Sequence, residues 1–306
     1  MLEILLPMAA LILVGTLWRP LKPMGLDADT TRRSLTGLVY VLLLPALVLD
    51  VLWKAPLGID SLRIVLMAAF GVVTAALAAT LIFRREWLPD DVRGSLIIAS
   101  AWGNATYLGL PVLEQTFGPG FRSVALHYDL FANTPLLLTL GVWIAQRHGQ
   151  GSATHSPVGE IIRVPAIWAA AVAILFNLNG VATPEGLGKV LNLLGNSVAP
   201  LMLLALGMGL RWDVLSLRCL PVALPVIVIQ LFMTPFIIYW ASLGVGLEGD
   251  LRAAVILEAA MPTMVLGMVI CDRYKLDTSI FAAATTLSTA LSLLTLPLWY
   301  GWISGT

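Results

Sequence analysis

Long apolar stretches alternate with short polar breaks along the whole chain. Each stretch is bounded by charged residues or by clusters of glycine and proline. A helix that crosses the hydrocarbon core of a bilayer needs about 20 predominantly apolar residues, so this pattern predicts membrane-spanning helices. Ten spans are expected, over residues 2–18, 33–53, 61–83, 93–117, 121–145, 161–180, 187–211, 216–246, 250–273 and 277–302.

The composition agrees with this pattern and excludes a soluble globular domain. Of the 306 residues, 58% are hydrophobic and only 12% are charged, whereas a soluble domain carries about 25% charged residues. The 18 basic and 18 acidic residues cancel to a formal net charge of zero. Nucleic-acid binding therefore has no support, and the expected surroundings are a lipid bilayer.

The longest polar break, residues 146–160, divides the chain into two halves of five spans. We expect a first five-helix repeat at 1–150, a linker at 151–160 and a second repeat at 161–306. Of the 18 basic residues, 13 lie in the odd-numbered connections between spans. Because basic residues accumulate in cytoplasmic loops, the linker is predicted to be cytoplasmic and both termini to lie outside.

The two halves carry similar proline segments at a slowly increasing offset. The sequence LPAL at 44–47 matches APLM at 199–202, and NTP at 133–135 matches TLP at 295–297. When a unit with an odd number of spans is duplicated, the second copy has the opposite orientation in the membrane. The sequence thus predicts the inverted-repeat plan of many secondary transporters.

Two segments place proline and glycine near the middle of the membrane. They are GNATYLGLPVL at 103–113 and EAAMPTMVLGMVI at 258–270. Proline lacks an amide donor and glycine is a poor helix former, and unwound backbone at this depth must be surrounded by protein or water. A proline kink is the alternative for either span alone, whereas two matching breaks form a site. The expected break residues are Gly103, Gly109, Pro111, Pro262 and Gly267.

These segments resemble a known family. NATYLGLP at 104–111 resembles the fourth-span signature of the auxin efflux carrier family of transporters. AMPT at 260–263, followed by DRY at 272–274, resembles its ninth-span signature, and residues 200–210 are similar to its seventh span. The resemblance covers essentially the whole chain.

The resemblance implies an all-α fold of ten helices like that of the sodium/bile-acid symporters and sodium/proton antiporters. In that fold a scaffold moves against a core in which broken helices four and nine cross. Family members carry small organic anions, including malonate for bacterial permeases and indole-acetate-type carboxylates in plants. Thr106 stands where a glycine is frequent in the family, and Leu266 where an asparagine often follows the second proline. These departures leave the substrate open.

No lysine or arginine lies deep in an expected span. An anionic substrate would therefore rely on the amide groups at half-helix N-termini and on neutral polar side chains. The expected substrate-binding residues are Asn104, Ala105, Thr106, Asn133, Thr134, Met261, Pro262 and Thr263.

Acidic groups inside a membrane are costly and are functional candidates. Glu258 lies four residues before Pro262, where a carboxylate and freed carbonyl groups could ligate sodium. The stretch 258–261 also resembles the sodium-binding stretch of the bile-acid symporters. A proton is the alternative ion, and a hydrogen bond to a neighbouring helix is the structural alternative. The expected coupling-ion residues are Glu258, Ala259, Met261 and Asp129.

The predicted function is secondary active transport of a small mono- or dicarboxylate such as malonate, coupled to sodium, with alternating access in a bacterial inner membrane. Two alternatives remain, a proton-coupled or uncoupled carboxylate exporter and a membrane sensor that does not transport. Neither HExxH nor GxSxG occurs, so an enzyme is not expected. No cofactor other than a sodium ion is expected, and a homodimer through the scaffold helices is left open.

Overall fold

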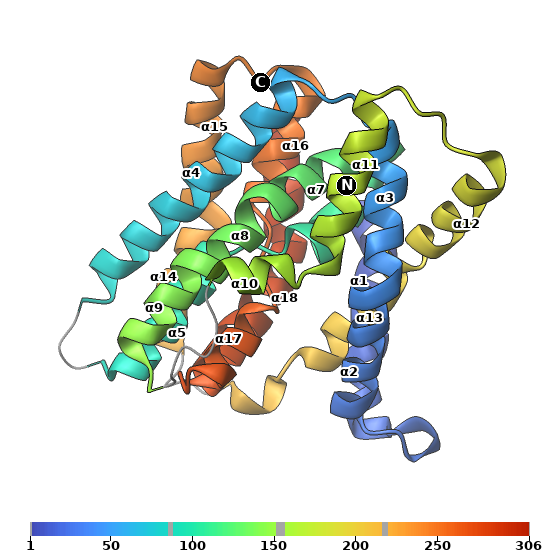
Figure 1. Ribbon diagram of the computed structural model, residues 1–306. Coiled ribbons are helices and arrows are strands. Elements are labelled where there is room, and N and C mark those ends of the chain that lie inside the picture. Colours follow the sequence, from blue (N-terminus) through green and yellow to red (C-terminus); the bar gives the residue numbers. More distant parts are fainter. Residues whose placement is uncertain (1, 85–87, 151–156, 216–219, 306) are drawn as a thin grey trace.

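The computed structural model describes residues 2–84, 88–150, 157–215 and 220–305. Within these ranges the secondary structure is helical, apart from one isolated β-bridge (Figure 1). Six helical runs in the described residues are long and apolar enough to cross a membrane. The expectation of an all-α polytopic membrane protein is confirmed, and the arrangement as ten spans in two inverted repeats stays a prediction.

The first half of the chain forms nine α-helices, some of which continue into one another through wider π turns. The helices are α1 (Leu2–Leu21), α2 (Ala28–Leu38), α3 (Leu44–Lys54), α4 (Ile59–Ile82), α5 (Asp90–Ala101), α6 (Leu110–Phe117), α7 (Arg122–Tyr128), α8 (Thr134–Leu136) and α9 (Val142–His148). The π turns are η2 (Val39–Leu43), η3 (Ala105–Gly109), η5 (Asp129–Asn133) and η6 (Leu137–Gly141). The short 3-10 turns η1 (Pro23–Gly25) and η4 (Pro119–Phe121) lie in connections.

The second half has the same character. Its helices are α10 (Pro157–Ile162), α11 (Pro165–Leu178), α12 (Glu185–Asn196), α13 (Val198–Gly209), α14 (Leu220–Val228), α15 (Thr234–Val245), α16 (Gly249–Ala259), α17 (Gly267–Arg273) and α18 (Thr278–Ser304), with the 3-10 turn η7 (Trp212–Val214) and the π turn η8 (Ile229–Met233).

Four prolines explain the position of most π turns. Pro45, Pro111, Pro135 and Pro235 each occupy the second position of a helix that directly follows a π turn. A proline ring inside a helix clashes with the carbonyl group of the preceding turn and removes one hydrogen bond. A wider turn relieves that clash, so these helices continue through the proline.

The helices pack into two groups. A scaffold group contains α1–α3 with α11–α13, and a core group contains α4–α9 with α14–α18. The scaffold group is the blue and yellow-green assembly at one side of Figure 1. Its tightest contact joins α1 to α13, where a Cβ atom on Gly207 would lie 2.8 Å from the carbonyl carbon of Ile12 and 3.0 Å from Cα of Gly15. Small residues therefore let the two backbones touch.

Asn177 of α11 joins two scaffold helices. Its Nδ2 donates to the carbonyl oxygens of Leu52, Trp53 and Ala55, at 3.1, 2.8 and 2.8 Å. The last carbonyl groups of a helix have no partner within the helix, so this amide satisfies the end of α3.

Asn177→Ala is expected to lower the stability of the folded protein. The change leaves partly buried carbonyl groups without a donor, which costs about 1–3 kcal/mol. The melting temperature in detergent measures the effect. Asn179→Ala is the matched control, because the Asn179 amide is exposed and donates within its own helix to Leu175. Equal melting temperatures for the two variants would show that the hydrogen bonds of Asn177 do not stabilise the folded protein.

Candidate functional site

Helical structure is interrupted in two expected spans. Between α5 and η3, Trp102 has φ −113° and ψ 109°, and Asn104 has φ −85° and ψ 65°. Between α16 and α17, residues 260–266 leave the regular helix. Gly103 and Pro262 lie inside these breaks, and Gly267 is the first residue of α17.

Two of the expected break residues lie beyond the first break. Gly109 has helical angles, φ −63° and ψ −50°, and Pro111 is the second residue of α6. The missing amide of a proline costs nothing at the start of a helix, and the preceding π turn accommodates the ring. The position of the break is therefore set by residues 102–104.

The two breaks cross and hydrogen-bond to each other. Gly103 forms an antiparallel bridge with Thr263. The amide of Asn104 donates to the carbonyl of Pro262 at 2.7 Å, and the amide of Met264 donates to the carbonyl of Trp102 at 2.8 Å. Each break thus supplies partners for the backbone groups that the other has freed, as unwound backbone in a membrane interior requires.

Gly103 permits this close approach. A Cβ atom at this position would lie 2.9 Å from Nε2 of Gln230 and 3.3 Å from the carbonyl oxygen of Met261. Gln230 itself donates from Nε2 to that carbonyl at 2.8 Å. Gln230 was not among the expected site residues, although an amide side chain inside the apolar span 216–246 was a usable signal.

Asp129 is buried, and each of its two carboxylate oxygens accepts a hydrogen bond from a neighbouring side chain. The hydroxyl of Thr106 donates to its Oδ2, and the hydroxyl of Thr134 donates to its Oδ1 at 3.0 Å. Nδ2 of Asn133 lies 3.4 Å from the same Oδ1. The carboxyl group is therefore well supplied with donors beside the break.

Asn133 attaches the η5 segment to the first break. Its Nδ2 donates to the carbonyl of Gly103 at 2.8 Å, and its own backbone carbonyl accepts from Nε1 of Trp102 at 3.0 Å. Thr263 anchors the other strand of the crossing, because its hydroxyl donates to the carbonyl of Ala99 at 2.8 Å and its amide donates to Oγ of Ser288 at 3.2 Å. The structure brings these residues together at one place.

Glu258 is the exceptional side chain of this region. Its exposed fraction is 0%, and among the described residues neither carboxylate oxygen has a hydrogen-bond partner. The carboxylate lies against Gly109, where an added Cβ atom would be 2.7 Å from its Cδ, and it interacts electrostatically with Asp129. A charge that is buried without partners is costly, so this carboxylate needs a counter-charge.

Other polar atoms near the crossing also lack partners in the described part of the chain. Most of them are acceptor oxygens. They are Oδ1 of Asn104, Oδ1 of Asn133 and Oε1 of Gln230, together with the donor Nδ2 of Asn104. Ala105, Ala259 and Met261 are buried beside them and contribute backbone groups.

Known proteins resemble the chain over nearly its full length. Residues 152–300 match the family described as "Membrane transport protein". An uncharacterized transporter of Methanothermobacter thermautotrophicus is 28% identical over 302 residues, which cover 97% of this chain and 96% of the relative. The uncharacterized transporter MJ1031 of Methanocaldococcus jannaschii is 26% identical over 230 residues, covering 71% and 70%.

These matches identify the chain as a membrane transporter, and they support its place in the auxin efflux carrier family. It is a transporter and not an enzyme, as the sequence predicted. The crossing of the two breaks is accordingly the candidate transport site.

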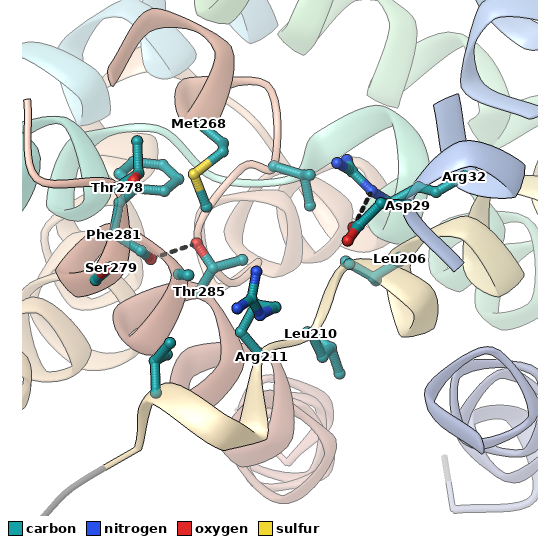
Figure 2. A pocket seen from close by; sticks show the side chains of 14 residues that line it. Asp29, Arg32, Leu206, Leu210, Arg211, Met268, Thr278, Ser279, Phe281 and Thr285 are labelled. Carbon is teal, nitrogen blue, oxygen red and sulfur yellow. Dashed lines mark hydrogen bonds and ion pairs between the residues drawn. The ribbon is translucent and has the colours of Figure 1, made fainter. Parts of the chain in front are cut away.

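The transporter has a cavity of about 150 Å³ between its two helix groups. Figure 2 shows Asp29 and Arg32 on one side and Thr278, Ser279 and Phe281 on the opposite side. Val265 and Met268, which also line the cavity, follow directly on the second break. The cavity therefore extends from the odd-numbered connections toward the crossing.

Glu114 belongs to a polar cluster that joins the two helix groups. Its carboxylate accepts from Nη2 of Arg122, and the same nitrogen donates to Oδ1 of Asn196 at 2.8 Å. Asn196 belongs to the scaffold group, whereas Glu114 and Arg122 belong to the core group. This cluster therefore ties the two groups together.

Proposed function

We propose that the transporter is secondary active and carries a small organic anion together with sodium through alternating access at the crossing. The observation that carries this proposal is the Glu258 carboxylate, which is fully buried without a hydrogen-bond partner in the described residues. The sodium ion is cargo in this scheme, and the carboxylate is its principal ligand.

Sodium fits the chemistry of the unpartnered atoms better than a proton does. A hard cation prefers several oxygen ligands from carboxylates, amides and carbonyls, and the orphan atoms around the crossing are mostly of this kind. A protonated Glu258 would need an acceptor for its O–H, and neither of its oxygens forms a hydrogen bond within the described residues. Asp129 is already held by three side-chain donors, so we assign it the role of supporting charge.

Asn104 is the proposed contact for the anion at the crossing. It precedes the helical run 105–117, whose N-terminal end carries partial positive charge. Its Nδ2 is a buried donor without an acceptor among the described residues. A sodium ion at Glu258 would offset the charge of that carboxylate and so reduce its repulsion of an organic carboxylate next to Asn104.

The two helix groups are the proposed moving parts. The scaffold of α1–α3 and α11–α13 would stay in place while the core, which holds both breaks, shifts against it. A cavity that opens between the groups on one side supports this division. The inverted repeat, with units at 1–150 and 161–306, would then generate the equivalent state that opens to the other side.

Uptake into proteoliposomes tests the proposal. We expect an inward sodium gradient to drive accumulation of at least one radiolabelled compound from a panel of mono- and dicarboxylates that includes malonate and indole-acetate. A sodium ionophore should abolish the accumulation, and protein-free liposomes are the control. Accumulation driven by a proton gradient alone would overturn the sodium assignment. Binding without flux would identify a sensor in place of a transporter.

A further inference from the structure

The cavity between the helix groups is lined by several charged residues, and most of them are already paired. Arg19 donates to both carboxylate oxygens of Asp29, at 3.1 and 2.9 Å. Arg211 donates to both oxygens of Asp213, at 2.9 and 2.8 Å. Two arginines and two aspartates are thus neutralised in pairs with bidentate geometry.

Arg32 is the charge that remains. Its Nε lies 3.9 Å from Oδ1 of Asp29, which makes a long ion pair but not a hydrogen bond (Figure 2). This Nε is buried and has no hydrogen-bond partner in the described part of the chain, and the side chain lines the cavity. Because Arg19 and Arg32 share the single negative charge of Asp29, one positive charge remains uncompensated beside the cavity.

The opposite wall offers an apolar surface with little competing charge. Val265, Met268 and Phe281 line the cavity on this side, and the hydroxyl of Thr285 donates to the carbonyl of Phe281 at 2.9 Å. A cavity of about 150 Å³ is smaller than the roughly 300–1,000 Å³ of sites for drug-sized ligands. A carboxylate with a short carbon chain matches this volume, with its charge at Arg32 and its carbon chain against the wall.

The cavity is also connected to the crossing. Val265 lies two residues beyond Thr263, whose amide donates to Oγ of Ser288. That hydroxyl in turn donates to the carbonyl of Thr285 at 3.2 Å, and Thr285 lines the cavity. A ligand in the cavity is therefore adjacent to the candidate transport site.

We propose that Arg32 binds the carboxylate group of the transported anion in this cavity, as a station between the aqueous face and the crossing. The inference rests on the proposed function, because it assumes an anionic cargo. Arg32 would supply the positive charge that the interior of the spans lacks. A guanidinium group suits this role because its planar donors match the two oxygens of a carboxylate.

Substitutions at Arg32 test the inference against a matched neighbour. Arg33 is exposed and adjacent on the same helix, so Arg33→Gln removes the same charge outside the cavity. We expect Arg32→Gln to raise the KM of carboxylate uptake and the Kd measured by calorimetry in detergent by about tenfold. Arg32→Lys should recover part of the affinity, and Arg33→Gln should leave both constants within about twofold of the unmodified protein.

The kinetic constants separate binding from structural damage. A binding role predicts a raised KM with kcat within about twofold and an unchanged melting temperature. An Arg32→Gln variant with the constants of Arg33→Gln would overturn the inference while leaving the proposed function intact. If Arg32→Gln does not fold, Arg32→Lys tests the inference in its place. The lysine ammonium cannot match both carboxylate oxygens as the planar guanidinium does, so the affinity for the carboxylate should still fall. Absence of accumulation by the unmodified protein would contradict the proposed function instead.

Discussion

Glu258→Gln is expected to abolish the sodium dependence of transport while the protein keeps its fold. The amide has the shape of the carboxylate but no charge, so the site loses the ligand that holds a cation. The stability of the empty protein should rise, because an unpartnered buried charge is removed. Sodium-22 uptake into proteoliposomes and initial carboxylate rates over a range of sodium concentrations measure the loss.

Glu248→Gln is the matched control for this change. Glu248 is exposed and precedes the same helix, α16, at its other end, so its loss should leave sodium dependence unaltered. The melting temperature in detergent without sodium completes the experiment. Sodium-dependent transport by Glu258→Gln would show that the Glu258 carboxylate is not the sodium ligand. A lower melting temperature for Glu258→Gln would indicate that the Glu258 carboxylate has a stabilising partner in the folded protein.

Gly109→Ala is expected to weaken sodium binding through one added methyl group. Gly109 has ordinary helical angles, so alanine fits the backbone and only the side chain creates a conflict. Its Cβ atom would press on the Glu258 carboxylate, 2.7 Å from Cδ. Overpacking of this kind costs about 1–3 kcal/mol, which corresponds to a rise of roughly 5-fold to 150-fold in the sodium concentration for half-maximal rate.

A double variant makes the Gly109 experiment specific. In Gly109→Ala with Glu258→Asp, the shorter acid leaves room for the methyl group, so the pair should bind sodium better than the sum of the single effects predicts. Gly37→Ala is the control, since a Cβ atom there meets no atom within 4 Å. Strictly additive losses in the double variant would contradict contact between Gly109 and the carboxylate as the cause.

The sequence predicted the helical membrane architecture because apolar length and charge distribution determine it directly. It also selected the segments that cross, since proline and glycine in mid-span weaken a helix. It named Gly103, which lies in the first break, but it could not show that this break is confined to residues 102–104 and excludes Gly109 and Pro111. That location depends on backbone hydrogen bonds to Pro262 and Met264, which are distant in the chain and leave no local pattern.

Two functional candidates were missed for a different reason. The positive-inside rule explains every arginine near a span end as a signal of orientation, so Arg32 carried no separate signal. Gln230 was overlooked because its neighbours are uniformly apolar. Only tertiary packing shows that Arg32 lines a cavity and that Gln230 holds the Met261 carbonyl.

The crossing has a consequence for how such transporters diversify. The two direct ties between the breaks run from Asn104 to Pro262 and from Met264 to Trp102, and both join main-chain atoms. Bonds between main-chain atoms survive most changes of side chain. Related transporters can therefore differ in the side chains that select the cargo while the crossing of the two breaks stays intact. Gly103 is the exception, because any larger residue would collide with Gln230.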